Sequence, residues 1–297
     1  MSLRTSLFIA TLSSVGLSCH GPTQPDVTET RSPQIAFTSD RNGNEDIHVM
    51  SAPHGTVSCL TNHTARDTDP DWSHDGSRIA FTSYRDGNAD VFLMQANGDR
   101  ITNLSNHPAF DGFPDWSPDG SKVAFTSYRD GNSEIYLIDV TTGEVENLTR
   151  HSAFDILPMW SPDGSRIAFV SKRQHNWDLY LMNADGGELT RLTRDAGVDV
   201  EPTWSPDGSR IAFTSMRDGN DEIYVINVDG TGLSRLTDHS AFDGFPAWSP
   251  DGDGIAFTSM RDGNEEIYSM RPDGSGLQRL TDSPANDRFP RWRPQQR

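Results

Sequence analysis

The chain has 297 residues, which is long enough for one large domain or for two domains of ordinary size. Its 43 acidic and 25 basic residues give a formal net charge of −18, which repels nucleic-acid phosphates and anionic lipid surfaces and argues against both as partners. Only 34% of the residues are hydrophobic, and 25 glycines and 18 prolines favour many short strands with tight turns over long helices.

Residues 1–18 have the layout of an export signal peptide. A positive charge at Arg4 is followed by a mostly apolar or small stretch over residues 7–17, and then by Cys19. The stretch is too short to anchor the chain by spanning a membrane. A small residue before a cysteine resembles the cleavage site of a bacterial lipoprotein, which implies a lipid on Cys19 and a periplasmic protein held at an envelope membrane. Gly16 stands where that pattern prefers leucine, so secretion without lipid stays open as the alternative.

Residues 19–32 are predicted to be a flexible tether, because they are polar, contain two prolines and lack periodicity. The folded body is then expected over residues 33–297. Cys19 and Cys59 are the only cysteines, which excludes a disulfide framework.

The folded body repeats every 44 residues, a signature of solenoids and propellers. Tryptophans recur at this interval at positions 72, 116, 160, 204, 248 and 292. An I/V-A-F triplet recurs in the same way, starting at positions 35, 79, 123, 167, 211 and 255. Six copies without an insertion predict six equivalent structural units.

One unit, residues 111–149, contains four short apolar or alternating runs separated by the turn signals S-P-D-G, R-D-G-N and T-T-G. Loops this short require antiparallel neighbours, so each unit is a four-stranded antiparallel sheet. Sheets that pack radially cover each other's faces, which predicts an all-β, six-bladed β-propeller. The first unit lacks its innermost strand, and residues 288–293 are the surplus segment that would supply it and close the ring.

The repeat W-S-P-D-G-S-R-I-A-F-T-S-x-R-D-G-N-x-E-I-Y, with D-G and L-T after it, resembles that of TolB-type propellers over residues 33–297. TolB carries a further α/β domain ahead of its propeller, and we expect a propeller without it here. The resemblance implies a binding scaffold of the bacterial cell envelope, a monomer that engages another envelope protein or a peptide at one face of the propeller.

The meander places the loops that enter the first strand and the R-D-G-N loops on one face, and the S-P-D-G turns on the other. An aspartate precedes each tryptophan by five residues on the first face, at Asp67, Asp111, Asp155, Asp199, Asp243 and Asp287. An arginine recurs in each R-D-G-N loop of that face, at Arg41, Arg85, Arg129, Arg173, Arg217 and Arg261. Two interpretations stay open: structural Asp–Arg pairs that latch the blades, or an acidic ring at the mouth of a funnel that binds a cation or a basic partner group.

Metal and catalytic signals are weak. The R-D-G-N-x-[DE] loop superficially resembles a calcium loop but lacks the bidentate glutamate, so no cofactor is expected and calcium is a lesser alternative. G-x-S-x-G, H-E-x-x-H and C-x-x-C are all missing from the sequence, which predicts a non-enzymatic protein. The alternative is a metal-assisted polysaccharide lyase or hydrolase built on a propeller. The channel-facing residues before each tryptophan lack the histidine and carboxylate cluster that it needs: Asp71, Asp115, Met159, Thr203, Ala247 and Arg291.

Blade four departs from the repeat. Lys172-Arg173-Gln174-His175-Asn176-Trp177 replaces R-D-G-N, and Ile156 and Leu157 replace the usual Gly-Phe of the entry loop. An exposed aromatic beside apolar residues is typical of a binding hot spot, and local packing of a drifted loop is the alternative. The sequence therefore predicts an exposed Trp177 in a partner-binding surface made of Asp155, Ile156, Leu157, Met159, His175 and Trp177.

Overall fold

The structure, a computed structural model, describes residues 32–295. The expected signal peptide, nearly all of the tether and Cys19 lie outside these residues, so their roles stay predictions. Within residues 32–295 every regular element is a β-strand. Among these described residues there is no helix that is long and apolar enough to cross a membrane.

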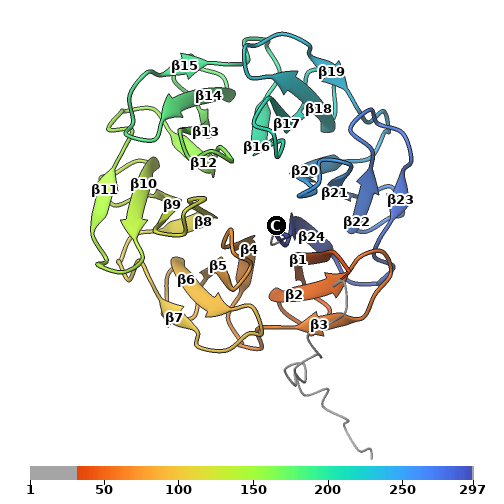
Figure 1. The fold of residues 1–297 in the computed structure, drawn as a ribbon, viewed down its shortest axis with the longest axis horizontal. Helices are drawn as coiled ribbons and strands as arrows, with labels where there is room; N and C mark the ends of the chain where they lie inside the picture. The colour runs from red at the N-terminus through yellow and green to blue at the C-terminus, as the bar shows by residue number, and fades with distance from the viewer. Residues whose placement is uncertain (1–31, 296–297) are drawn as a thin grey trace, which may run out of the picture.

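Six four-stranded antiparallel sheets stand in a ring around a central channel (Figure 1). The innermost strands of blades two to six, and then of blade one, are β4 (Asp67–Trp72), β8 (Asp111–Trp116), β12 (Asp155–Trp160), β16 (Asp199–Trp204), β20 (Asp243–Trp248) and β24 (Asp287–Trp292). The second strands, from blade one to blade six, are β1 (Gln34–Ser39), β5 (Arg78–Ser83), β9 (Lys122–Ser127), β13 (Arg166–Ser171), β17 (Arg210–Ser215) and β21 (Ile255–Ser259).

The outer half of each blade is formed by a long third strand and a short edge strand. The third strands are β2 (Asp46–Ser51), β6 (Asp90–Gln95), β10 (Glu134–Asp139), β14 (Asp178–Asn183), β18 (Glu222–Asn227) and β22 (Glu266–Met270). The edge strands are β3 (Val57–Cys59), β7 (Thr102–Asn103), β11 (Val145–Asn147), β15 (Thr190–Arg191), β19 (Ser234–Arg235) and β23 (Gln278–Arg279). Edge strands this short leave little backbone free for pairing with another chain.

The predicted ring closure is confirmed, because the C-terminal strand β24 pairs antiparallel with β1 in blade one (Figure 1). Side chains reinforce this pairing. Arg41 reaches Asp287 at 2.6 Å, and the Asn286 backbone N–H donates to Asp40 Oδ1 at 2.8 Å. The two ends of the folded body therefore complete the same sheet.

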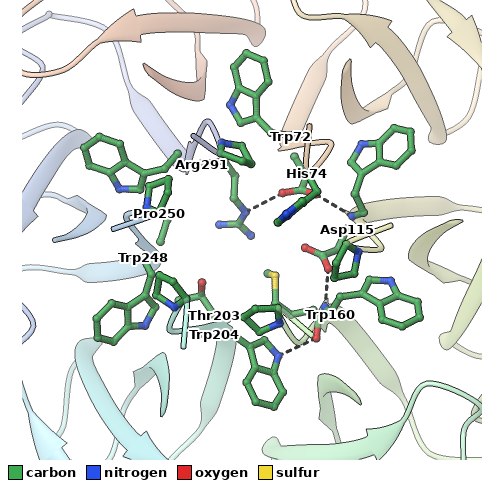
Figure 2. A pocket seen from close by; sticks show the side chains of 18 of the residues that line it. Trp72, His74, Asp115, Trp160, Thr203, Trp204, Trp248, Pro250 and Arg291 are labelled. Atoms are coloured by element: carbon green, nitrogen blue, oxygen red, sulfur yellow. Dashed lines mark hydrogen bonds and ion pairs between the residues drawn. The ribbon is translucent and has the colours of Figure 1, made fainter. Parts of the chain in front are cut away.

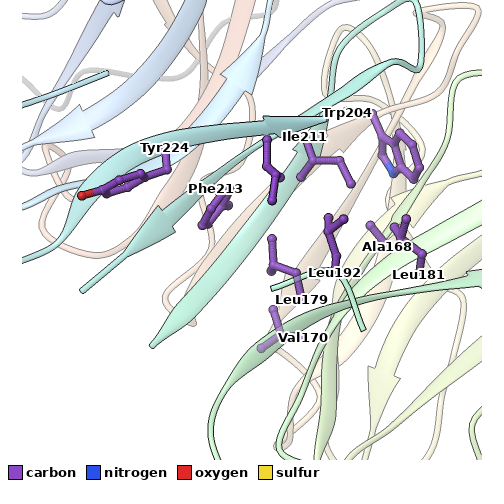
Figure 3. Close-up of a cluster of buried hydrophobic side chains, with 10 residues drawn as sticks. Ala168, Val170, Leu179, Leu181, Leu192, Trp204, Ile211, Phe213 and Tyr224 are labelled. Atoms are coloured by element: carbon purple, nitrogen blue, oxygen red, sulfur yellow. The ribbon is translucent and has the colours of Figure 1, made fainter. Parts of the chain in front are cut away.

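The apolar core lies between neighbouring blades. Successive side chains of a strand point to opposite faces of its sheet. The alanine of each I/V-A-F triplet therefore packs against one neighbouring blade, and the residues before and after it pack against the neighbouring blade on the opposite side. In the cluster between blades four and five, Ala168 and Leu181 pack against Ile211, Phe213 and the Trp204 ring (Figure 3). The tryptophans thus pack as wedges between the blades, and this orientation turns the residue before each of them toward the channel.

Candidate functional site

The aspartate ring is buried, which supports the structural Asp–Arg pairs and argues against an acidic funnel mouth. All six carboxylate side chains are fully buried, and each pairs with an R-D-G-N arginine at 2.6 to 2.9 Å. In blade three, Arg129 reaches Asp111 at 2.8 Å while its Nε donates to Ser127 Oγ. Burial nevertheless raises the pKa of Asp111 above its ordinary value. The six ion pairs hold loops to strands, as the structural interpretation predicts, and the aspartates do not face solvent.

The irregular loop of blade four packs on its own blade. Trp177 is half-buried, stacks on the exposed Phe154 ring with centroids 6.3 Å apart, and contacts the apolar cluster between blades four and five. Lys172 Nζ lies 5.4 Å from the centroid of the Trp177 ring. The expectation of an exposed Trp177 is therefore wrong, because the neighbouring rings and the adjacent blade cover it.

The six residues of the predicted blade-four surface do not form one site. Asp155 is buried against Arg173, whereas Met159 lies in the channel. Ile156 and Leu157 are partly buried against the same cluster as Trp177. His175 alone is exposed. Their partner-binding role stays a prediction.

The channel narrows at a ring of residues that sequence reasoning missed. Each innermost strand has a bulge three residues before its tryptophan, where a side chain other than glycine takes a positive φ of 53° to 59°. The residues at the bulge are Asp69, Phe113, Leu157, Glu201, Phe245 and Phe289. They line a cavity of only about 60 Å³, and the rings of Phe245 and Phe289 meet with centroids 4.3 Å apart. Four side chains of this constriction ring are apolar, and the other two are the acids Asp69 and Glu201.

Glu201 is an ionisable exception in the constriction ring. Its Oε2 accepts hydrogen bonds from Thr214 Oγ1 at 2.6 Å and from the Phe245 backbone N–H at 2.8 Å. Burial, the main cause in both cases, raises the pKa of Glu201 to about 7 and the pKa of Asp69 to about 6. Such groups are costly to ionise at this depth, so the constriction favours their neutral forms at mildly acidic pH.

Between the constriction ring and the S-P-D-G face, the channel widens into a cavity of about 790 Å³, which we call the funnel cavity (Figure 2). The conserved spacing of the repeat brings all six tryptophans of the innermost strands to its wall, together with turn prolines of the S-P-D-G face. His74 replaces one of these prolines in blade two and is exposed at the rim. The lining therefore combines apolar tryptophan and proline side chains with polar groups at defined places, a mixture found in binding cavities.

The polar groups of the funnel cavity gather on one wall. Asp71 Oδ2 accepts from the Trp116 backbone N–H at 2.9 Å, and Asp115 Oδ2 accepts from that of Trp160 at 2.6 Å. The Arg291 guanidinium points into the cavity, with its Nε 3.9 Å from Asp71 Oδ1 (Figure 2). Burial raises the pKa of Asp71 to about 6, and burial with the charge of Asp71 holds the pKa of Asp115 well above its ordinary value.

The other wall, from blades four to six, is uncharged and carries Met159, Thr203 and Ala247. The predicted channel-facing positions are thus confirmed as lining the cavity. Within residues 32–295, no three histidine, cysteine, aspartate or glutamate side chains lie together in a group that could hold a metal ion. What the funnel cavity offers is an aromatic and proline-lined recess with charge on one side.

Comparisons with known proteins agree with this architecture. The family model described as the TolB beta propeller domain matches residues 25–112, 113–241 and 197–297. No curated protein has a sequence that matches this chain.

Among solved structures, TolB from Acinetobacter baumannii is 23% identical, with a TM-score of 0.82 over 90% of this chain and 68% of that one. A putative TolB from Agrobacterium tumefaciens is 26% identical, with a TM-score of 0.71 over 88% and 92%. An oligogalacturonate lyase in complex with manganese has the fold at 16% identity, with a TM-score of 0.59 over 84% of this chain and 73% of that one.

Proposed function

Because the chain belongs to the TolB beta-propeller domain family, we propose that it is a non-enzymatic binding scaffold of the bacterial cell envelope, whose funnel cavity receives a segment of a protein or peptide partner. The funnel cavity carries this proposal. It combines a volume of about 790 Å³ with six tryptophans at the wall and only a few charged groups. The tryptophan rings are mostly buried between the blades, so a ligand in the cavity would meet mainly the turn prolines, the channel-facing side chains and the small exposed part of those rings.

The partner enters from the S-P-D-G face in this proposal. The funnel cavity is lined by turn residues of that face, whereas the constriction ring narrows the channel toward the R-D-G-N loops. The aspartates of the opposite face are occupied by their arginines and have no accessible surface to offer a partner. The site is thus at the other end of the channel from the one that the repeated aspartates suggested.

Export and a monomeric state belong to the same proposal. The layout of residues 1–18 supports export, and the short, paired edge strands give little surface for association through the blade edges. Mass spectrometry of the mature amino terminus tests the lipid on Cys19, since a diacylglyceryl mass at that residue separates an anchored protein from a secreted one.

Partner capture from an envelope extract tests the cavity when the wild type is compared with Ala247→Arg. Arg291 occupies the equivalent position in blade one, so the scaffold accepts an arginine there, and a second guanidinium from the neighbouring blade six would enter the cavity beside it. The matched control is Leu277→Arg, which adds the same side chain to the outer edge of the same blade, where Leu277 is 47% exposed.

We expect Ala247→Arg to lose the captured partner and Leu277→Arg to retain it. Equal capture by both variants, with unchanged folding by circular dichroism, would refute the proposal. Trp177→Ala in the same assay tests the blade-four surface, because loss of capture in that variant would move the partner to the R-D-G-N face.

A polysaccharide lyase or hydrolase is the second candidate, favoured only by the shared fold of the manganese-containing lyase. Such an enzyme would require a metal-holding cluster, and none is formed among the described residues 32–295.

A further inference from the structure

Asp115 is a buried carboxylate with an unused oxygen in the funnel cavity. The residue is only 6% exposed, and its Oδ2 is taken by the Trp160 backbone N–H at 2.6 Å. The carboxylate is directed into the cavity (Figure 2). Among residues 32–295, no lysine, arginine or histidine forms an ion pair with it. Burying a carboxylate without a counter-ion is energetically costly, so this oxygen is a favourable place for a cation.

Asp71 presents a second oxygen next to it. Its Oδ2 accepts from the Trp116 backbone N–H, which leaves Oδ1 as the oxygen without a hydrogen bond from that strand. Arg291 Nε approaches that oxygen no closer than 3.9 Å, which is longer than a hydrogen bond. When both carboxylates are ionised, the single guanidinium leaves a net negative charge on this wall. Burial raises the pKa of both aspartates, as expected for carboxylates without adequate pairing.

The geometry selects among cationic groups. In each carboxylate, one oxygen already accepts from the backbone N–H of the next blade's tryptophan, so a ligand that used both oxygens would share that one. A guanidinium gains most from two oxygens of one carboxylate, in a planar fork. An ammonium group is a compact charge with three donors that can reach separate oxygens. The uncharged wall of Met159, Thr203 and Ala247 is suited to the methylenes or backbone that carry the ammonium.

We infer that Asp71 and Asp115 bind a primary ammonium group of the inserted segment, from a lysine side chain or from a free amino terminus. This inference rests on the proposed function of the funnel cavity. It adds the chemical class of the anchoring group and the wall to which that group binds. The ligand is thereby oriented, with its ammonium toward blades two and three.

The test uses two synthetic libraries of short peptides, one with acetylated and one with free amino termini, on the immobilised full chain. We expect the wild type to retain lysine-containing peptides from the acetylated library. Retention of lysine-free peptides from the free-amine library alone would identify the amino terminus as the source. For the best peptide, Asp115→Asn should weaken binding about tenfold, since the amide keeps the acceptor for Trp160 N–H but removes the charge.

Asp71→Asn is the second variant, with the same expected direction, in case Asp115→Asn folds poorly. The matched control is Asp253→Asn, which removes one charge from an exposed residue directly after the S-P-D-G turn of blade six, outside the funnel cavity, and should leave binding unchanged. Retained peptides without any ammonium, or equal binding by wild type and both cavity variants, would overturn the inference. If such peptides are still lost in Ala247→Arg, the proposed function stands and the ammonium site alone is refuted.

Discussion

Glu201, the half-buried glutamate of the constriction ring, should make the stability of the propeller depend on pH. Replacing Glu201 by glutamine keeps an oxygen that can accept from Thr214 Oγ1 and the Phe245 N–H, but removes the ionisable group. Burial raises the pKa of Glu201 from 4.5 to about 7 in the folded protein, so the native state holds a proton that the unfolded chain releases between these values. Stability from this group is therefore fully present below pH 4.5 and is lost as pH rises through 7.

The size of the effect follows from the shift. A change from 4.5 to about 7 corresponds to about 3 kcal/mol of unfolding free energy between pH 4 and pH 8. Glu201→Gln should match the wild type near pH 4 and exceed its stability by up to about 3 kcal/mol at pH 8. The other raised carboxyls, such as Asp69, are present in both proteins and cancel in the difference.

Urea denaturation followed by tryptophan fluorescence, at several pH values across this range, measures the difference directly. Glu146→Gln is the matched control, because Glu146 is exposed on the outer strand of blade three and should show no such pH-dependent gain. A stability difference between Glu201→Gln and wild type that stays constant with pH would refute a protonated glutamate in the channel.

Two further predictions concern the ion pairs and the question of metals. Asp111→Ala should lower the unfolding free energy by about 3 to 5 kcal/mol, because Arg129 then lies at a buried site without its partner. The double variant with Arg129→Ala should regain part of that loss, which a double-mutant cycle measures in urea denaturation. Thermal unfolding with calcium, zinc or EDTA should give the same midpoint temperature in each case. A metal that bound tightly to the folded protein would raise the midpoint by mass action, and such a rise would favour the lyase or hydrolase.

The fold was predictable from the sequence because every blade makes the same contact with the next one. A residue that packs between blades must therefore recur at the same position, as the tryptophans and the I/V-A-F triplets do. The closure by β24 was predictable for a related reason: the repeat starts at the second strand type and leaves one first strand over.

The site was harder to predict, since the recurrence that reveals the fold hides the function. The aspartates recur as regularly as core residues, and the arginine 18 residues after Asp111 was the signal that they are paired and buried. Trp177 looked exposed because its equivalents are small or polar, but the sequence does not show that Phe154 covers one side of it. Glu201 escaped notice because a bulge with positive φ, which turns it into the channel, has no glycine to mark it.

The channel position before each tryptophan shows why a symmetric ring can hold an asymmetric ligand. Because the tryptophan side chain points between blades, the preceding side chain points into the channel and takes no part in the packing that the repeat must preserve. These positions are free to differ, and their differences are ordered: Arg291, Asp71 and Asp115 come from three consecutive blades, whereas the next three blades give uncharged residues. Charges scattered around the ring would bind a ligand in several orientations of similar energy. Charges on one wall leave a single favourable orientation, so the blades can stay nearly identical while one unpacked position in each determines how a partner binds.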